Sequence, residues 1–338
     1  LSQELSVPKT QIESAVKLMD EGNTIPFIAR YRKEVTGGLD DTILRNLEER
    51  LHYLRNLEKR KQEVLELIAA SGKLDDKQME QMQKALEEAK MLSEVEDLYR
   101  PYKQKRKTRA SVAREKGLEP LAKFMLMQKP GGDLEQEAAR YVNAKKGVED
   151  VEQALSGAGD ILAEEISDSA QIRSRLREYL QKNAQISTTK GTKENQIYDM
   201  YSEYSESVRK IAPHRILAID RGEREEALKV SVEIDQQVCV GMIENQVIHR
   251  NSPFAKALHE VCEDSFKRLI FPSLERELRA QLTEKACAQA IGVFSENLKN
   301  LLMQPPVKGC VTMGFDPAYR TGCKIAVVDE TGKVLDTT

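Results

Sequence analysis

Two long stretches with leucines at three- and four-residue spacing constrain the fold of this chain more than any other feature. The first follows Asp40 and Asp41 and carries Leu44, Leu47, Leu51, Leu54, Leu65 and Ile68. The second follows Pro272 and carries Leu274, Leu278, Leu282, Ala286, Ala290, Phe294, Leu298 and Leu301. This spacing predicts helices over 40–70 and 272–301, the first roughly 45 Å long at about 1.5 Å per residue. We therefore expect a mainly α, elongated multi-helix scaffold in which the second helix is a spine for the others.

Shorter periodic segments, caps and prolines predict most of the remaining helices. They lie at 8–22, 26–34, 76–89, 93–100, 117–127, 134–142, 148–167, 169–182, 196–210, 236–247 and 252–269. Ser93 with Glu96 is typical of a capping box at the start of one of them. The segments 99–116 and 184–195 are predicted as loops.

Two parts of the sequence favour strands over helices. HRILAID at 214–220 and LKVSVEI at 228–234 predict a small β-hairpin near 214–234. After Pro305 and Pro306 the apolar period becomes two, which predicts strands at 311–315, 324–329 and 333–336. Three strands do not bury their faces alone, so we expect the rest of that sheet beyond Thr338. The expected domains are 1–195, 196–306 and 307–338.

Composition limits the kinds of partner that this chain can have. Its 338 residues carry a net charge of −3, so nucleic-acid binding would have to come from local patches. The sequence has neither a membrane-length apolar run nor a signal-peptide pattern, which favours a cytoplasmic location. Five cysteines without a CxxC pair are typical of reduced thiols. The missing initiator Met and the abrupt end suggest a fragment.

The most basic stretch is YRPYKQKRKTRASVAREK at 99–116. Six of the ten residues from 100 to 109 are Lys or Arg, and none is acidic. Such a run can release counterions from a phosphate backbone, and Tyr99 and Tyr102 offer possible stacking faces. The predicted nucleic-acid contacts here are Arg100, Lys103, Lys105, Arg106, Lys107 and Arg109. An alternative is that the run lies against the acidic residues just before it, which include Glu94, Glu96 and Asp97.

A second candidate nucleic-acid contact lies near the N-terminus. The segments 8–22 and 26–34 have the outline of a helix-turn-helix, and Arg30, Arg32 and Lys33 add cations to the second helix. Most such outlines are ordinary helical hairpins, so DNA binding is one of two interpretations.

Evidence for catalysis or for a metal is weak. Asp316 ends the first predicted strand of GFDPAYRTG, as in RNase H-like nucleases and actin-like ATPases, but a single carboxylate can equally stabilise its own turn. His259 and Cys262 have helical i,i+3 spacing without a second ligand pair. No nucleotide or protease motif occurs, so no cofactor, metal or catalytic residue is predicted.

Four segments together resemble one family. IPFIARYRKEVTGGLDD (25–41), VEDLYRPYKQKRKTRASVAREKGLEPLA (95–122), HRILAIDRGEREEALKV (214–230) and GFDPAYRTGCKIAVVDETGKV (314–334) are similar to the Tex family of bacterial transcription accessory proteins. The resemblance extends over the whole chain, in the family's order.

The resemblance implies a helical N-terminal scaffold followed by a YqgF-type, RNase H-like domain. Helix-hairpin-helix and OB-fold RNA-binding domains would follow outside this chain. It also implies similarity to a eukaryotic elongation factor that binds histones, and a YqgF-type domain that is generally non-catalytic. Ala318, where many such sequences have Gly, further weakens the transfer of nuclease activity.

Three functions remain open from the sequence. The first is a non-enzymatic, nucleic-acid-binding transcription accessory factor that meets RNA or DNA mainly through domains missing here, and possibly the transcription machinery. The second is a metal-dependent nuclease in which Asp316 is one ligand of a site completed beyond this chain. The third is a protein-docking scaffold.

Overall fold

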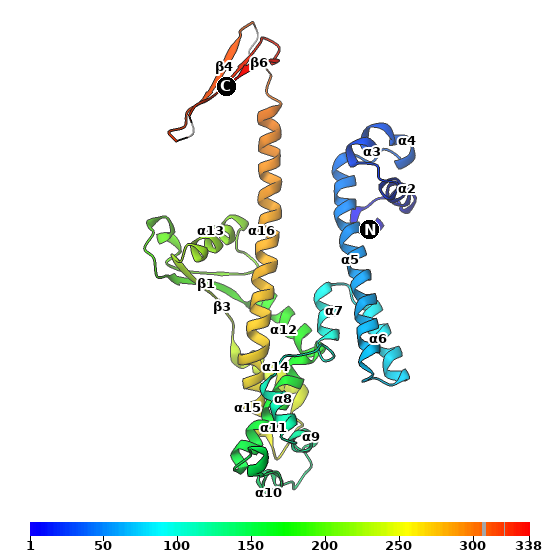
Figure 1. Ribbon diagram of the computed structural model, residues 1–338, viewed down its shortest axis with the longest axis vertical. Helices are drawn as coiled ribbons and strands as arrows, with labels where there is room; N and C mark the ends of the chain where they lie inside the picture. The colour runs from blue at the N-terminus through cyan, green and yellow to red at the C-terminus, as the bar shows by residue number, and fades with distance from the viewer. Residues whose placement is uncertain (306–308, 321) are drawn as a thin grey trace. The chain divides into compact units, whose positions relative to one another are not determined.

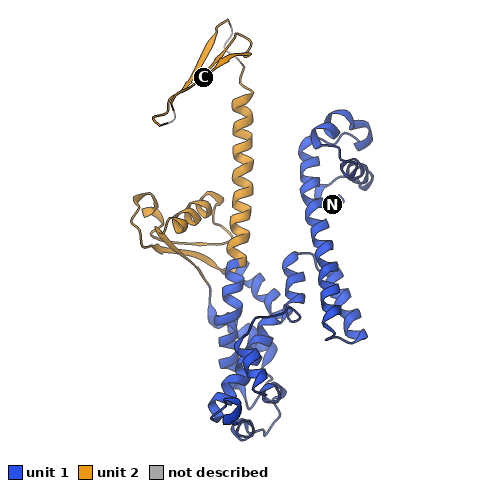
Figure 2. Cartoon of the chain, in the orientation of Figure 1, with its two compact units in different colours: residues 1–182, 234–276 blue, residues 183–233, 277–338 orange. Residues whose placement is uncertain are grey.

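The chain forms two compact units and is mainly helical, as the leucine spacing predicts. The computed structural model describes residues 1–305, 309–320 and 322–338. One unit comprises residues 1–182 and 234–276, and the other residues 183–233 and 277–338 (Figure 1). Figure 2 shows that each unit combines separate parts of the chain. No helix within the described ranges has both the length and the apolar character to cross a membrane.

The first unit begins with seven helices, of which α5 is the longest. They are α1 (Ser2–Leu5), α2 (Lys9–Asp20), α3 (Ile25–Tyr31), α4 (Lys33–Thr36), α5 (Asp41–Ser71), α6 (Asp76–Glu88) and α7 (Leu92–Tyr99). The Asp40 carboxylate caps α5 by accepting a hydrogen bond from the Ile43 amide at 2.8 Å. Leu44 and Leu47 join one apolar cluster with α2 and α3, and Val64 joins another with α6 and α7. The predicted long helix is confirmed.

A break at Arg32 divides the helix expected over 26–34 into α3 and α4. Arg32 has φ −131°, and α4 ends at Gly37 with φ +65°. A Cβ at position 37 would lie 2.2 Å from Nε2 of Gln11. Glycine therefore permits the left-handed turn without strain, and the Gln11 side chain of α2 lies in the space that a Cβ would take.

The rest of the first unit is also helical, and α11 contacts several of its other helices. The helices of this part are α8 (Arg109–Glu115), α9 (Glu119–Met127), α10 (Leu134–Ala139), the 3₁₀ helix η1 (Ala144–Lys146), α11 (Val151–Asp168), α12 (Ala170–Asn183), α14 (Gln236–Val247), α15 (Ala255–Asp264), the π-helix η3 (Ser265–Ile270) and the start of α16 (Phe271–Leu302). α11 buries Ala158, Ile161 and Leu162 and packs against α8, α9 and α15. Ser265 of η3 donates a hydrogen bond to the Ala163 carbonyl at 2.8 Å. α11 thus links segments about 100 residues apart.

Two local predictions in this unit are wrong: the capping pair of one helix and the extent of one loop. Helix α7 begins at Leu92 because Glu94, and not the Ser93–Glu96 pair, satisfies the amides at its start. The Glu94 carboxylate accepts hydrogen bonds from the backbone amides of Lys90 and Met91, at 2.6 and 3.1 Å. The predicted loop over 99–116 contains α8, which starts after Thr108 because this hydroxyl accepts a hydrogen bond from the Ser111 amide.

The second unit contains an antiparallel sheet in the order β2-β1-β3. Its elements are β1 (Gln185–Lys190), the 3₁₀ helix η2 (Gln196–Tyr201), β2 (Glu203–Ser207), α13 (Pro213–Arg224) and β3 (Leu228–Glu233). HRILAID is helical because Pro213 suits a first turn and Ile216 and Ile219 are buried three residues apart. Val232 of β3 lies opposite Ile186 of β1. The strand predicted at 228–234 is confirmed as β3, but the strand predicted at 214–220 is helical, so the hairpin near 214–234 is wrong. The predicted loop over 184–195 contains β1, and only η2 of the helix predicted over 196–210 is present, because β2 follows it.

The strands predicted near the C-terminus are confirmed. They are β4 (Thr312–Asp316), β5 (Lys324–Val328) and β6 (Val334–Thr337), joined in antiparallel order with a register shift at Val327 and Val328. Met313 and Phe315 of β4 are exposed. Within the described residues, this sheet therefore has little apolar cover.

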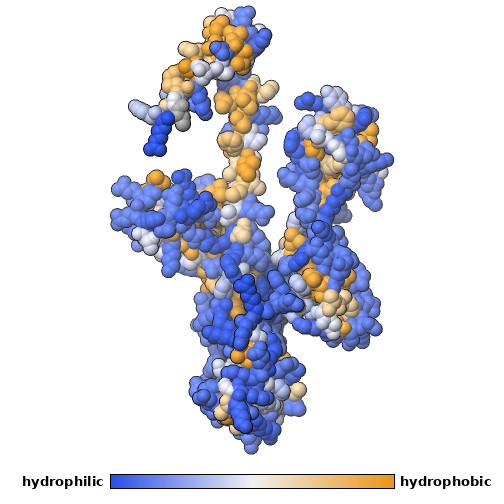
Figure 3. Space-filling view, in the orientation of Figure 1, coloured by the Kyte–Doolittle hydropathy of each residue, from blue (hydrophilic) through white to orange (hydrophobic). Residues whose placement is uncertain are grey.

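α16 is as long as predicted, but only its first half supports a core. Leu274, Leu278 and Ala286 are buried, whereas Phe294 and Leu301 are 68% and 62% exposed. Figure 3 shows apolar surface along the second half of this helix. The prediction that α16 is a spine is therefore wrong beyond Ala286 for the part of the chain that the structure describes.

A buried cluster of charges joins α7 to α12. The Asp97 carboxylate accepts hydrogen bonds from Arg173 Nε and Arg177 Nη2, both at 2.5 Å. All three side chains are less than 10% exposed. Arg173 also donates a hydrogen bond to the Ser273 hydroxyl of α16 at 3.1 Å. Burial lowers the pKa of Arg173 even though Asp97 opposes the shift. The fold therefore depends on a carboxylate that two desolvated cations share.

Replacing Asp97 by Ala is expected to lower the free energy of unfolding by roughly 3–5 kcal/mol, because both arginines lose the carboxylate that they share. Asp20→Ala is the matched control, since Asp20 forms an exposed ion pair with Arg55. That control should lose much less stability, because solvent screens an exposed ion pair. Urea unfolding followed by circular dichroism measures both changes. Equal, small losses would show that the buried cluster does not stabilise the fold.

Candidate nucleic-acid interface

The basic stretch divides into cations that face the protein and cations that face solvent. Arg100 approaches Asp168 at 3.3 Å, and Lys105 approaches Glu164 at 3.6 Å and also binds Asp168. Arg114 of α8 binds Glu164 at 2.8 Å. Part of the predicted interface therefore neutralises carboxylates of α11.

The two carboxylates of α11 are desolvated. Asp168 and Glu164 are 9% and 8% exposed. Burial raises the pKa of Asp168 despite the opposing charges of Lys105 and Arg100. Burial also acts to raise the pKa of Glu164, but the hydrogen bond from Arg114 and the charge of Lys105 lower it overall. These carboxylates fix the basic loop onto α11.

The acidic partners differ from those that the alternative interpretation expected. Among the acidic residues before the loop, Glu96 binds Arg60 at 2.6 Å, and Asp97 binds α12. Tyr99 and Tyr102 are half-buried in the apolar cluster of α5 to α7. Burial raises the pKa of the Tyr102 hydroxyl. The two rings are thus packing residues rather than free stacking faces.

Lys103, Arg106 and Lys107 form the solvent-facing part, which we call the outer triad. Their side chains are exposed and form no ion pair with any residue that the structure describes. Arg109 is also exposed, at the first position of α8. Of the six predicted residues in this segment, Arg100 and Lys105 form ion pairs, and the other four are exposed without an ion pair to a described residue.

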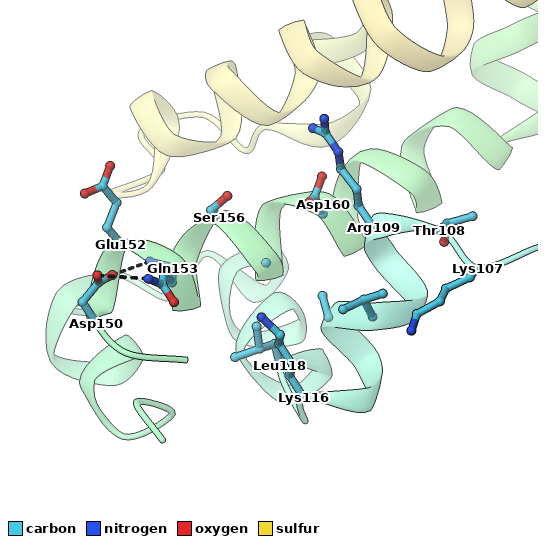
Figure 4. A pocket seen from close by; sticks show the side chains of 13 residues that line it. Lys107, Thr108, Arg109, Lys116, Leu118, Asp150, Glu152, Gln153, Ser156 and Asp160 are labelled. Atoms are coloured by element: carbon cyan, nitrogen blue, oxygen red, sulfur yellow. Dashed lines mark hydrogen bonds between the residues drawn. The ribbon is translucent and has the colours of Figure 1, made fainter. Parts of the chain in front are cut away.

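A groove of about 720 Å³ lies between α8 and α11, and Lys107 of the outer triad lines it (Figure 4). Lys107, Arg109 and Lys116 line it together with Asp150 and Asp160. Lys116 donates a hydrogen bond to the Gly147 carbonyl at 2.8 Å. The groove therefore has mixed charge, and its cations lie on the side of α8.

The N-terminal candidates lie on the separate corner formed by α3 and α4. Arg30, Arg32 and Lys33 are all exposed. The Arg32 guanidinium lies 5.4 Å from the centre of the Phe27 ring. A first helix and a turn precede α3, but the predicted second helix is divided at Arg32, and binding of DNA by this outline stays a prediction.

The weaker candidates remain isolated. Asp316 ends β4 opposite Lys324, and no described group of three His, Cys, Asp or Glu side chains is arranged to hold a metal. His259 binds Glu244 through Nδ1, and that hydrogen bond raises its pKa. Cys262 is buried, which raises its pKa to about 12. His259 and Cys262 are accounted for by these local contacts.

Sequence reasoning missed Glu164, Asp168 and Arg114. The four-residue spacing of the two acids places them on one side of α11, which is the available signal. Their partners lie about 50 to 65 residues away in sequence, so local patterns do not identify the pairing.

This helical frame and its final sheet define the chain as a multi-helix scaffold that continues into a YqgF-like domain. Three family models match it: the Tex-like protein N-terminal domain at 1–69, the Tex central region-like model at 129–294, and the Tex protein YqgF-like domain at 310–338. The chain belongs to the Tex family.

Similar proteins match over nearly the whole chain. The transcriptional accessory protein Tex of Neisseria gonorrhoeae is 43% identical over 100% of this chain and 45% of its own length. The uncharacterized protein YdcI of Bacillus subtilis is 47% identical over 99% of this chain and 47% of its own length. The human S1 RNA-binding domain-containing protein 1 is 34% identical over 100% of this chain and 35% of its own length. The chain thus spans about half the length of the bacterial relatives.

Replacing Lys105 by Ala should lower the free energy of unfolding by roughly 1–3 kcal/mol, because buried Asp168 loses a charged partner. Lys107→Ala, the matched control two residues away, should change it by less than about 0.5 kcal/mol. Chemical denaturation measures both variants. If both changes are equally small, Lys105 does not anchor the loop.

Proposed function

We propose that this chain is the helical scaffold of a non-enzymatic, nucleic-acid-binding transcription accessory protein, and that its basic loop is an auxiliary phosphate contact. The observation that supports this proposal most strongly is that the loop contains both ion-paired and exposed cations. Arg100 and Lys105 bind buried carboxylates, while Lys103, Arg106 and Lys107 face solvent.

The anchored loop is suited to a phosphate backbone. A segment that is already ordered loses less conformational entropy on binding than a free tail does. Three cations that form no ion pair with a described residue can replace counterions along several phosphates. Arg30, Arg32 and Lys33 are proposed as a second contact. Because the net charge is −3, attraction would be local to these patches.

The names of similar proteins support the same function. The Neisseria gonorrhoeae relative is named a transcriptional accessory protein, and the human relative is named for an S1 RNA-binding domain. We infer that RNA or DNA is bound mainly by parts of such proteins that this chain does not include. The proposed location is the cytoplasm, where the transcription machinery would be a further partner.

Replacing the outer triad, Lys103, Arg106 and Lys107, by Ala should weaken RNA and DNA binding by the 338-residue chain. The plot of log affinity against log salt should become shallower by about two to three units, since each lost phosphate contact removes about 0.7 to 0.9. Fluorescence anisotropy at several salt concentrations measures both quantities.

The matched control replaces Lys9, Lys84 and Lys182 by Ala. These lysines are exposed and each has a glutamate partner four residues away, so the control changes the net charge by the same amount. It should retain the affinity and salt slope of the unchanged chain. An outer-triad variant that also retains both would contradict the proposed contact.

The non-enzymatic part of the proposal has its own test. The chain incubated with Mg²⁺ or Mn²⁺ should leave single- and double-stranded RNA and DNA uncut, because Asp316 has no assembled group of carboxylates beside it among the described residues. Gel analysis of labelled oligonucleotides measures cleavage. Metal-dependent cleavage that Asp316→Asn abolishes would overturn this part of the proposal.

A further inference from the structure

We propose that the corner formed by α3 and α4 is a stacking site for single-stranded nucleic acid. This inference rests on the proposed nucleic-acid function but uses a surface separate from the basic loop. The surface, which we call the aromatic corner, consists of Phe27, Arg30, Tyr31, Arg32 and Lys33.

The aromatic corner presents two neighbouring rings to solvent. Tyr31 is 62% exposed and Phe27 is 36% exposed. Their centroids lie 5.4 Å apart, with the ring planes at 46°. Both are on α3 at i,i+4 spacing, which places them on one side of the helix. Neighbouring exposed rings are suited to contact with the faces of unpaired bases.

The cations of the aromatic corner differ from the other arginines of the N-terminal part. Between residues 1 and 100, five of the seven arginines form ion pairs with carboxylates: Arg45, Arg50, Arg55, Arg60 and Arg100. Arg30 and Arg32 have no ion pair with a described residue, and neither has Lys33. Glu34 is the one acidic residue in the segment from 22 to 39.

Arg32 connects the cationic and aromatic parts of the corner. Its guanidinium lies 5.4 Å from the centre of the Phe27 ring, while the side chain remains exposed. A guanidinium held there by the ring can also contact a phosphate. The cations of the corner suit phosphates and its rings suit base faces. A ligand that carries both phosphates and accessible bases is therefore favoured.

The opposite side of α3 holds the aromatic corner in place. Ile25 and Ile28 are 5% and 0% exposed and belong to the same apolar cluster as Leu44 and Leu47 of α5. The Thr36 hydroxyl donates a hydrogen bond to the Arg32 carbonyl at 3.2 Å. The exposed rings thus project from a supported helix.

Single strands fit this surface better than a duplex groove or a protein. Bases in a duplex are stacked on one another, whereas a single strand can place its bases on protein rings. α3 has seven residues, and its sequence IPFIARY contains no Asn or Gln to read adenine edges. Protein interfaces exclude most charge from their centres, but this corner is rich in cations that no described carboxylate pairs with.

The test compares Tyr31→Ala with Tyr31→Phe in the 338-residue chain. The probe is a 12-nucleotide single strand that contains 2-aminopurine, with the corresponding duplex as a second probe. Tyr31→Ala should weaken single-strand binding roughly fivefold to 100-fold and reduce quenching of 2-aminopurine, whereas Tyr31→Phe should retain both. Duplex affinity should change less than twofold. Circular dichroism establishes that both variants are folded.

The outer-triad variant separates this inference from the proposed function. If Tyr31→Ala binds single strands normally while the outer-triad variant binds weakly, the aromatic corner is not a site but the loop contact stands. If both variants retain normal affinity, both proposals are overturned. Three other results would also overturn the stacking site. They are an equal loss of affinity for single strand and duplex, equal effects of Tyr31→Ala and Tyr31→Phe, and no binding by the unchanged chain.

Discussion

The arrangement of the first unit depends on the carboxylate of Asp97 being shared by Arg173 and Arg177. A lone carboxylate or guanidinium at this depth would lose its hydration without compensation, so the three charges form a stable group only together. This requirement fixes the end of α7 against α12. The basic loop begins three residues later, at Arg100, and therefore starts from a fixed point.

Ion pairs with α11 fix the loop at two further residues and divide its cations into paired and exposed ones. Arg100 and Lys105 form ion pairs with the buried Asp168 of α11. The outer triad is exposed to solvent. Residues of the same type thus have different roles, set by whether a carboxylate lies within reach. The ion pairs that fix the loop also shape the proposed interface. Because the backbone is held at two residues, the remaining cations project from a fixed position.

Sequence patterns predicted the features whose signals are local. The structure confirms α5, its Asp40 cap and the strands β4 to β6. Each of these features depends on residues that are close to one another in the sequence. Features set by distant partners were missed. The polar strand β1, QISTTK, is a central strand because β2 and β3 flank it. The β-rich composition of HRILAID predicts a strand, but Pro213 favours the helix start that the structure has. For the site, the cationic stretch was evident, but its pairing with Glu164 and Asp168 was not. The roles proposed for the remaining cations stay predictions.

The uneven cover of α16 has a consequence for its motions. Around Leu274 and Ala286 an amide can exchange its hydrogen only when tertiary packing opens, whereas near Phe294 local unwinding of the helix is sufficient within the described residues. One continuous helix should therefore contain a slowly exchanging half and a rapidly exchanging half. Binding of any element along the exposed half would slow its exchange, so amide protection would reveal which conditions cover it.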